Sequence, residues 1–311
     1  MQDGRIGTHQ PSLPGGTDNS RTAAGLSPVT CPRARISGMT NFPPKWDDGT
    51  IADSAEHQVH WYDERTAIIR QALRTTFEGP FIYLLLGSER ALLLDTGTGD
   101  ADLRKVVDEL LDGRDLELVV AHTHGHGDHV GGDDQFRTEQ EKNGKRTYLV
   151  GKSAEEVASY FGITSWPDQV VEFDLGDRVL DVVPIPGHHA SHLAFYDRST
   201  QLLLTGDSLY PGRLYVFDWP AYRDSIARLA AFVAAGNPVE LVLGTHIEMT
   251  AQPGLDFEFG SDRHPGEHRL QLAPEALTEL AAALEEAGET PRRIVRDDFI
   301  VFPLSPTGEP L

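Results

Sequence analysis

A dense cluster of possible metal ligands lies in residues 121–132, where the sequence reads AHTHGHGDHVGG. Four histidines and one aspartate fall within eight consecutive positions of this segment. Side chains two residues apart in an extended segment point the same way, so His124 and His126 can bind one ion together. Asp128 and His129 follow a glycine, where the chain can turn, and can face a second ion. The spacing therefore indicates a metal site.

Three later segments deliver residues of the same kind. In each, an apolar run that reads as a strand ends in a glycine-containing loop, and a potential ligand follows. These runs and ligands are 179–185 before His188, 202–205 before Asp207, and 240–244 before His246. Loops at one edge of a rigid scaffold are where binding sites are usually built, so we expect these side chains to converge.

The motif Thr123-His-x-His-x-Asp-His129, with the three later ligands in order, resembles the metallo-β-lactamase superfamily of hydrolases. Every ligand position of its two-metal members has a match here. The segment Leu94-Asp95-Thr-Gly97 also resembles the first motif of that family. The likeness spans roughly residues 57–250.

The resemblance implies both a fold and a role for each residue. The fold would be α/β, an αβ/βα four-layer sandwich with two sheets inside, helices outside and the metals at one rim. Asp95 would orient a ligand or a loop by hydrogen bonding. The implied metal ligands are His124, His126 and His188 for the first ion, Asp128, His129 and His246 for the second, and Asp207 between them.

Histidine nitrogens and carboxylates without a thiolate suit zinc, and iron and manganese are also tolerated. We therefore expect two Zn²⁺ ions about 3.5–4 Å apart that share a water or hydroxide. A bound metal lowers the pKa of water from near 16 to about 7, which supplies a nucleophile without serine or cysteine. Asp128 can in addition take up or deliver a proton when the tetrahedral intermediate collapses.

The residue expected between the metals favours one group of substrates. Some β-lactamases of the superfamily have cysteine near this position, whereas aspartate is typical of glyoxalase II-like thioesterases and lactonases. We therefore predict hydrolysis of a small ester, thioester or lactone. Tyr210 lies three residues after Asp207, where a tyrosine of some lactonases faces the substrate carbonyl, and a packing role is equally open. His192 lies where such relatives often have a second histidine.

Other functions remain open on the sequence alone. A β-lactamase or another amide-cleaving relative would use the same metals. A mononuclear iron dioxygenase of the persulfide dioxygenase kind would use fewer ligands, and a complete set of ligands argues against it. A nuclease usually has a basic arm or an added domain, and a flavin-linked enzyme has a fused flavin domain. A structural role for the whole set is disfavoured, because buried histidines and aspartates are costly without partners.

Several further residues could belong to the site or to the scaffold. His122 reads as a strand end, and Glu248 reads as a loop support. The loop 251–269 could wall the substrate site or be solvated. The other residues left open are His189, His264, His268, Phe217 and Trp219.

The remaining pattern predicts strands that alternate with helices. The helices are expected at 102–111, from the Ser153 capping box to Phe161, at 221–235, and from Pro274 to Ala287. The other strands are expected at 81–86, 90–94, 117–121, 147–150, 170–173, 193–196 and 294–302.

Composition limits the partners. The formal net charge is −21, and no cluster of Lys or Arg is present, so neither nucleic acid nor an anionic membrane is an expected partner. A small-molecule substrate is expected, and the oligomeric state is open. The single cysteine, Cys31, and the lack of a signal peptide or apolar span favour a cytoplasmic protein. Residues 1–40 read as a disordered leader, with Met39 as a possible alternative start, and 41–311 as one catalytic domain.

Overall fold

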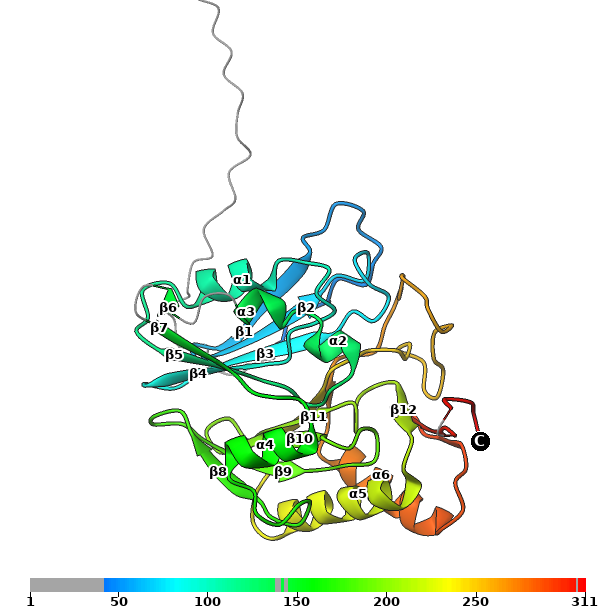
Figure 1. Cartoon of the computed structure of the whole chain (residues 1–311). Coiled ribbons are helices and arrows are strands. Elements are labelled where there is room, and N and C mark those ends of the chain that lie inside the picture. Colours follow the sequence, from blue (N-terminus) through cyan, green and yellow to red (C-terminus); the bar gives the residue numbers. More distant parts are fainter. Residues whose placement is uncertain (1–41, 138–140, 143–144, 306) are drawn as a thin grey trace, which may run out of the picture. The chain divides into compact units, whose positions relative to one another are not determined.

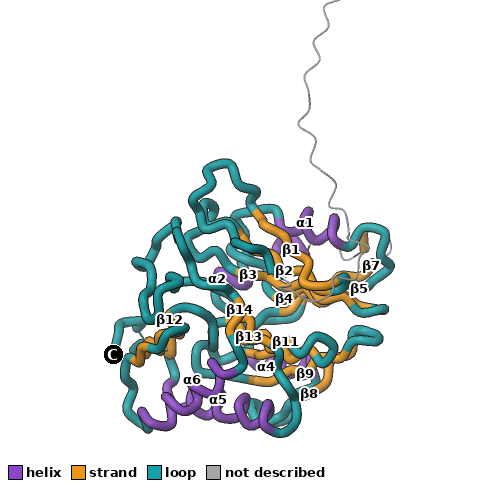
Figure 2. The backbone as a smooth tube through the Cα atoms, turned by 180° about the vertical axis from the view of Figure 1, so that it is seen from behind, coloured by secondary structure: helices purple, strands orange, loops and turns teal. Residues whose placement is uncertain are grey.

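The computed structural model describes residues 42–137, 141–142, 145–305 and 307–311. The expected leader lies outside the described residues, and the division of the chain into leader and domain stays a prediction. Within the described part, two β-sheets face each other and helices cover their outer faces (Figures 1 and 2). This arrangement is the α/β sandwich that the resemblance implied.

The first sheet has seven strands. Its first four form an antiparallel meander, β4, β5 and β7 run parallel, and β6 is antiparallel to β7. In spatial order the strands are β1 (His57–Asp63), β2 (Thr66–Gln71), β3 (Phe81–Leu86), β4 (Arg90–Leu94), β5 (Glu117–Ala121), β7 (Lys145–Leu149) and β6 (Glu141–Lys142).

The second sheet has six strands and is antiparallel except where β11 and β13 run parallel. In spatial order they are β14 (Gln271–Leu272), β13 (Leu241–Gly244), β11 (Leu202–Gly206), β10 (Leu193–Asp197), β9 (Val179–Pro184) and β8 (Val171–Asp174).

Alternation along the strands divides the core into three layers. In β3, Phe81, Tyr83 and Leu85 point between the sheets, where they meet residues of β9, β10 and β11. The intervening Ile82 and Leu84 face outward, under a helix layer. A strand that is buried on both faces reads as a continuous apolar run, and this explains the sequence FIYLLL.

Helices cover both outer faces of the two sheets. Beside the first sheet lie α1 (Leu103–Leu110) and α3 (Asp134–Arg137), and beside the second lie α5 (Trp219–Ala234) and α6 (Glu275–Ala287). The short α2 (Gly127–Val130) lies in the histidine-rich segment. Ser153 forms the predicted capping box of α4 (Ala154–Phe161), which packs into the layer between the sheets.

A third, small sheet contains β12 (Arg213–Val216), β16 (Ile300–Pro303) and β15 (Ile294–Val295). The prediction of one strand over 294–302 was therefore wrong. The polar stretch Arg296-Asp297-Asp298 forms a turn, in which the Arg296 amide donates to the Phe299 carbonyl at 2.9 Å, and the two halves pair as a hairpin.

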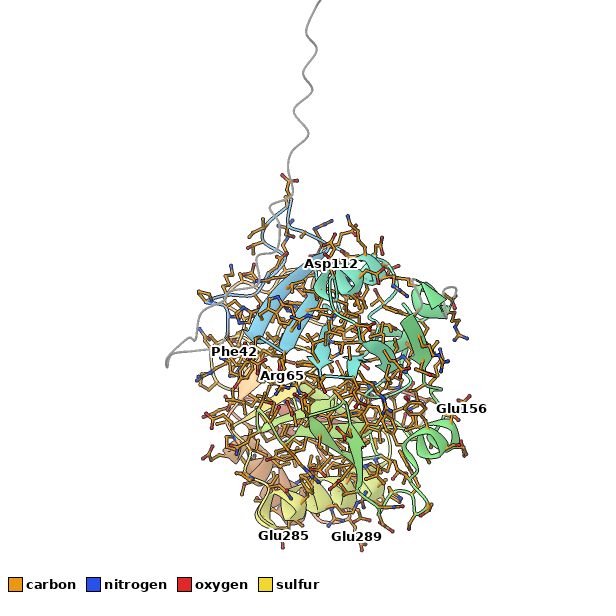
Figure 3. All side chains as sticks on the ribbon, turned by 90° about the vertical axis from the view of Figure 1, so that its left-hand side faces the viewer. Phe42, Arg65, Asp112, Glu156, Glu285 and Glu289 are labelled. Carbon is orange, nitrogen blue, oxygen red and sulfur yellow. The ribbon has the colours of Figure 1, made fainter. Side chains whose placement is uncertain are left out.

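Part of the acidic charge lies on the surface of the fold. Asp112, Glu156, Glu285 and Glu289 are exposed and are labelled in Figure 3. Among the described residues, no helix has the length and apolar character that crossing a membrane requires.

Candidate metal centre

Strand register brings the predicted ligands to one rim of the sandwich. Gly206 of β11 pairs with Gly244 of the parallel strand β13, so Asp207 and His246 leave neighbouring strand ends on the same side. In the first sheet, Leu94 pairs with Ala121 of the parallel strand β5. The histidine-rich segment therefore begins beside Asp95.

Three histidines converge on one point, and we call them the three-histidine group. They are His124, His126 and His188. Nε2 of His124 lies 3.0 Å from Nδ1 of His126, and Nε2 of His188 lies 3.1 Å and 2.9 Å from those two atoms. All three nitrogens could therefore contact a single ion at the same time.

A second set of atoms lies next to it, and we call it the Asp128 group. It comprises Asp128, His129, Asp207 and His246, whose ligand atoms all lie within 4.8 Å of one another. Oδ2 of Asp128 lies 3.1 Å from Nε2 of His129 and 3.2 Å from Nε2 of His246.

The Asp207 carboxylate reaches both groups. Its Oδ2 lies 3.8 Å and 3.5 Å from Nε2 of His124 and His188. Its Oδ1 lies 3.5 Å and 3.4 Å from Nε2 of His129 and His246. The Thr245 hydroxyl donates a hydrogen bond to Oδ1, which holds the carboxylate between the groups.

Outer hydrogen bonds fix which nitrogen faces inward in three of the imidazoles, those of His129, His188 and His246. Nδ1 of His188 donates to the Tyr215 carbonyl at 2.7 Å, and Nδ1 of His246 donates to the Glu78 carbonyl at 2.9 Å. Nδ1 of His129 contacts the Asp95 carboxylate at 2.9 Å. Because these partners accept hydrogen bonds, Nδ1 of each of these rings carries a proton, and Nε2 faces the centre.

The arrangement fits metal ions. Nε2 of His129 is buried and has no hydrogen-bond partner, although a carboxylate lies beside it. Lone pairs that face one another at about 3 Å repel, and a cation among them removes that cost. Nitrogen and carboxylate donors without thiolate are typical of zinc and of other divalent transition metals.

Electrostatics differ between the two groups. Burial lowers the pKa of His188 to about 4, and it also lowers the pKa values of His124 and His126. These imidazoles are therefore neutral, as metal ligands must be. Burial alone would also lower the pKa values of His129 and His246. Nearby carboxylates, chiefly those of Asp128 and Asp207, outweigh burial and raise both pKa values well above the usual range. The Asp128 group thus attracts positive charge strongly.

Asp95 holds a ligand of the Asp128 group in place by hydrogen bonding. The family resemblance implied this role of orienting a ligand or a loop. Its fully buried carboxylate accepts from the Thr123 amide at 2.7 Å, the Thr123 hydroxyl at 2.9 Å and His129. Asp95 also has a positive φ of 74°, an unfavourable conformation that these bonds maintain.

Tyr210 and Glu248 form part of the scaffold. Tyr210 is buried, and its hydroxyl donates to the Arg213 carbonyl at 2.5 Å and to Glu248 at 3.1 Å. Glu248 also accepts from the Arg213 amide. This geometry favours the packing interpretation of Tyr210, and its role in the reaction stays a prediction.

Three histidines beside the predicted ligands have other partners. His122 is buried and contacts Asp133 at 2.8 Å, so it anchors the start of the ligand segment. His192 is buried against His124, with ring centroids 4.6 Å apart, and contacts the Ser208 hydroxyl. His189 is half-buried and contacts the Ser191 hydroxyl, and its ring lies 4.8 Å from that of His126.

The remaining candidates divide between core and surface. His264 is buried and stacks on Phe257, and His268 contacts Asp298 at 3.0 Å. Trp219 is buried and donates to the Gly288 carbonyl. Phe217, by contrast, is partly exposed beside the three-histidine group.

Sequence reasoning missed several supporting groups. The carbonyls of Glu78 and Tyr215 orient ligands, but a backbone carbonyl has no signal in the sequence. The Thr245 hydroxyl could have been found, since it directly precedes His246. Asp133 could also have been found, because it follows the motif by four residues and accepts from Thr96 and His122.

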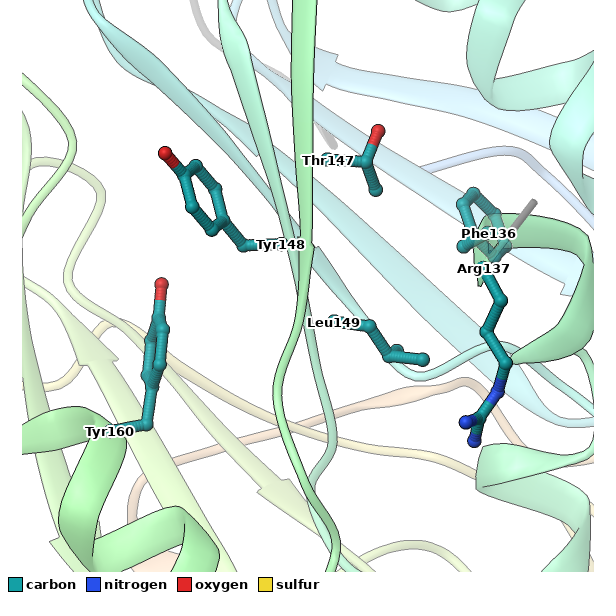
Figure 4. Close-up of a pocket in the computed structure, with 6 residues that line it drawn as sticks. All are labelled: Phe136, Arg137, Thr147, Tyr148, Leu149 and Tyr160. Carbon is teal, nitrogen blue, oxygen red and sulfur yellow. The ribbon is translucent and has the colours of Figure 1, made fainter. Parts of the chain in front are cut away.

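One hollow, of about 530 Å³, lies elsewhere on the first sheet (Figure 4). Phe136, Arg137, Thr147, Tyr148, Leu149 and Tyr160 line it. None of the predicted metal ligands is among them.

Comparison with known proteins identifies the family. Residues 75–273 match the model of the metallo-beta-lactamase superfamily, and the chain belongs to this family. The solved metallo-beta-lactamase from Pontibacter korlensis has a TM-score of 0.51 at 17% identity, covering 74% of this chain and 99% of its own, and this shows the shared fold.

Curated relatives match over part of their length. The lactamase-like protein adaB of Aspergillus niger is 30% identical over 178 residues, 56% of this chain and 53% of its own. A hydroxyacylglutathione hydrolase of Aeromonas salmonicida is 31% identical over 50% of this chain and 58% of its own. The acyl-coenzyme A thioesterase MBLAC2 of Gallus gallus is 29% identical over 54% and 72%, respectively. The chain thus spans little more than half the length of the first two.

Proposed function

We propose that this protein is a hydrolase that uses two divalent metal ions, most simply Zn²⁺, to cleave a small ester, thioester or lactone. One observation carries the proposal. The Asp207 carboxylate lies between the three-histidine group and the Asp128 group, with one oxygen toward each. Such a shared carboxylate is what a pair of adjacent cations requires.

The ligand set supports two ions rather than one. The three-histidine group with Asp207 offers one ion four donor atoms, and Asp128, His129 and His246 with the same carboxylate offer another ion four. If only the three-histidine group held an ion, the buried Nε2 atom of His129 would remain without a partner. Leaving a buried polar atom unpaired costs about 1–3 kcal/mol.

When bound, the ions would acidify water and polarise the carbonyl of the substrate. The chain supplies the geometry and the charge. Asp207 and Asp128 contribute negative charge, and Asp95 and the Glu78 and Tyr215 carbonyls orient the imidazoles of His129, His246 and His188 so that Nε2 faces inward. His129 and His246 hold the pKa of Asp128 well below its usual range despite burial, so this carboxylate is ionised at neutral pH. We infer that binding is its main role, because so weak a base accepts protons poorly.

Two observations favour esters and thioesters over β-lactams. Asp207 would lie between the two ions, and an aspartate at this position is typical of thioesterases and lactonases of the family. Two of the relatives bear the names hydroxyacylglutathione hydrolase and acyl-coenzyme A thioesterase. The substrate of this chain is therefore sought first among thioesters and lactones.

A substrate panel tests the proposal. Protein loaded with Zn²⁺ is assayed on thioesters, aryl esters, lactones and the β-lactam nitrocefin. We expect turnover of the first three classes. The turnover rate of His126→Ala should be at least about a hundredfold lower, because the metals activate the nucleophile. His268→Gln serves as the matched control, since this histidine contacts Asp298 outside the metal centre. Near-normal turnover by His126→Ala would refute the assignment.

Metal analysis separates the mononuclear iron alternative. Protein purified without added metal is expected to contain, or to take up, two divalent ions per chain and to hydrolyse without consuming oxygen. A single iron together with oxygen uptake on a persulfide would instead identify a dioxygenase.

A further inference from the structure

Three partly exposed phenylalanines flank the metal centre, and we call them the aromatic rim. They are Phe77, Phe217 and Phe259, with 39%, 38% and 69% of their surface exposed. Single exposed apolar residues are ordinary, whereas a group of them beside a reactive centre indicates a binding surface. The three come from separate segments of the chain.

Phe217 lies against the three-histidine group. Its ring centroid is 5.9 Å from the rings of both His126 and His188. The residue directly follows β12, whose Tyr215 carbonyl holds His188. A group bound at the three-histidine group would therefore lie within reach of this ring.

Phe77 and Phe259 lie on the side of the Asp128 group. Their ring centroids are 5.6 Å apart in an edge-to-face arrangement. Phe77 immediately precedes Glu78, whose carbonyl holds His246. The guanidinium of Arg213, at the start of β12, lies 5.9 Å from the ring of Phe259.

The loop that carries Phe259 is firmly anchored. Arg213 donates to the Phe257 carbonyl and to Asp256, both at 2.9 Å. Further along, Glu267 forms a buried two-pronged pair with Arg70, at 2.6 and 2.9 Å. Such anchoring fixes a strongly exposed phenyl ring in place, which lowers the entropic cost of binding to it.

β12 connects the two parts of the rim. Arg213 at its start contacts Phe259, and Phe217 follows its end. Four residues of extended strand span about 13 Å, enough for an acyl chain of medium length. The charge of Arg213 is already balanced by Asp256 and Glu248, so this surface offers an anionic group little attraction.

We propose that the aromatic rim binds the apolar acyl chain of the substrate. The preferred substrates are then thioesters, esters or lactones with a medium-length aliphatic acyl group. This inference rests on the proposed function, because it names the substrate class of the same centre. Phe77 and Phe259 are specificity residues in this proposal, and they leave the reaction at the metals unchanged.

A chain-length series tests it. The zinc-loaded protein is assayed on neutral N-acetylcysteamine thioesters with acetyl, butyryl and octanoyl groups. Burying one methylene group is worth about threefold to fourfold in affinity, so kcat/KM is expected to rise at least about thirtyfold from acetyl to octanoyl. Phe77→Ala and Phe259→Ala should each lower kcat/KM for the octanoyl thioester by about fivefold to tenfold. Their kcat/KM for the acetyl thioester should stay within about twofold of the wild-type value. The corresponding Leu variants should retain most of the activity on octanoyl.

Tyr148→Ala is the matched control, because Tyr148 is an aromatic residue on β7 with 38% of its surface exposed, against 39% for Phe77. This substitution should leave kcat/KM unchanged for both the acetyl and the octanoyl thioester. The role of the rim would be overturned if kcat/KM were equal across chain lengths, or if the rim variants lost equally on acetyl and octanoyl. Either result would leave the proposed hydrolase function intact. Failure to hydrolyse any member of the series or of the wider panel would overturn the proposed function itself.

Discussion

Replacing Asp95 with asparagine should weaken metal binding at one group by changing the tautomer of a histidine. Oδ1 of Asp95 accepts from the Thr123 amide, and Oδ2 accepts from the Thr123 hydroxyl and faces Nδ1 of His129. The backbone amide can only donate, so it keeps the oxygen of the asparagine. The new NH₂ group then faces His129 and donates to Nδ1. The proton of the imidazole must move to Nε2, which removes the lone pair that the metal needs.

The size of the effect follows from the bond that is lost. A hydrogen bond to a charged group contributes about 1.5–3 kcal/mol, which corresponds to roughly tenfold to 150-fold in an equilibrium constant. Loss of such an outer partner typically lowers metal affinity by about 10–100-fold. We therefore expect Zn²⁺ affinity at the Asp128 group to fall by about that factor, and affinity at the three-histidine group to fall much less.

Competition with a chromophoric chelator measures the two affinities, and nitrogen-15 NMR of the imidazoles reports the tautomer. Asp112→Asn is the control, because Asp112 is exposed and its substitution removes the same charge from the surface. The reasoning is refuted if Asp95→Asn binds two ions with wild-type affinities, or if His129 keeps its proton on Nδ1.

Three further predictions concern stability. Burial, aided by Arg70, lowers the pKa of His264 from 6.5 to about 4. At pH values between these two, the unfolded chain therefore binds one proton more than the folded chain. Stability should fall as pH drops from about 6.5 to 4, by up to about 3 kcal/mol from this group, and urea unfolding of His264→Gln should show a shallower fall. Glu267→Gln leaves Arg70 buried with an uncompensated charge, so it should lower the unfolding free energy by about 3–5 kcal/mol, and an unchanged midpoint in denaturant would contradict this. Zn²⁺ at a hundred times its Kd should raise the unfolding free energy by about 2.7 kcal/mol per site, and EDTA should reverse the gain in a thermal melt.

The proposed metal ligands could be recognised in the sequence because their signals are local. His124, His126, Asp128 and His129 lie in one short motif, and each remaining ligand directly follows an apolar strand. Continuous apolar runs also predicted β3, β4 and β5, since a strand buried on both faces has little else in its sequence. The family resemblance then implied the sandwich of two sheets, which periodicity alone does not determine.

What the sequence did not predict depends on contacts between distant segments. β1 has every residue half-buried and lacks a clear alternation, and β12 is a four-residue strand that pairs with the chain's last strand. The outer partners of His188 and His246 are carbonyls that any residue could supply. The aromatic rim likewise joins residues from loops far apart, so only the folded chain shows that Phe77 and Phe259 touch.

Metal stoichiometry tests the central claim most directly. Protein is dialysed against a small excess of Zn²⁺, and bound metal is counted by mass spectrometry in the wild type, in His188→Ala and in His246→Ala. The account predicts two ions per chain in the wild type and about one in each variant, because each substitution removes a ligand from a different group. One ion or none in the wild type, or two in both variants, would contradict it.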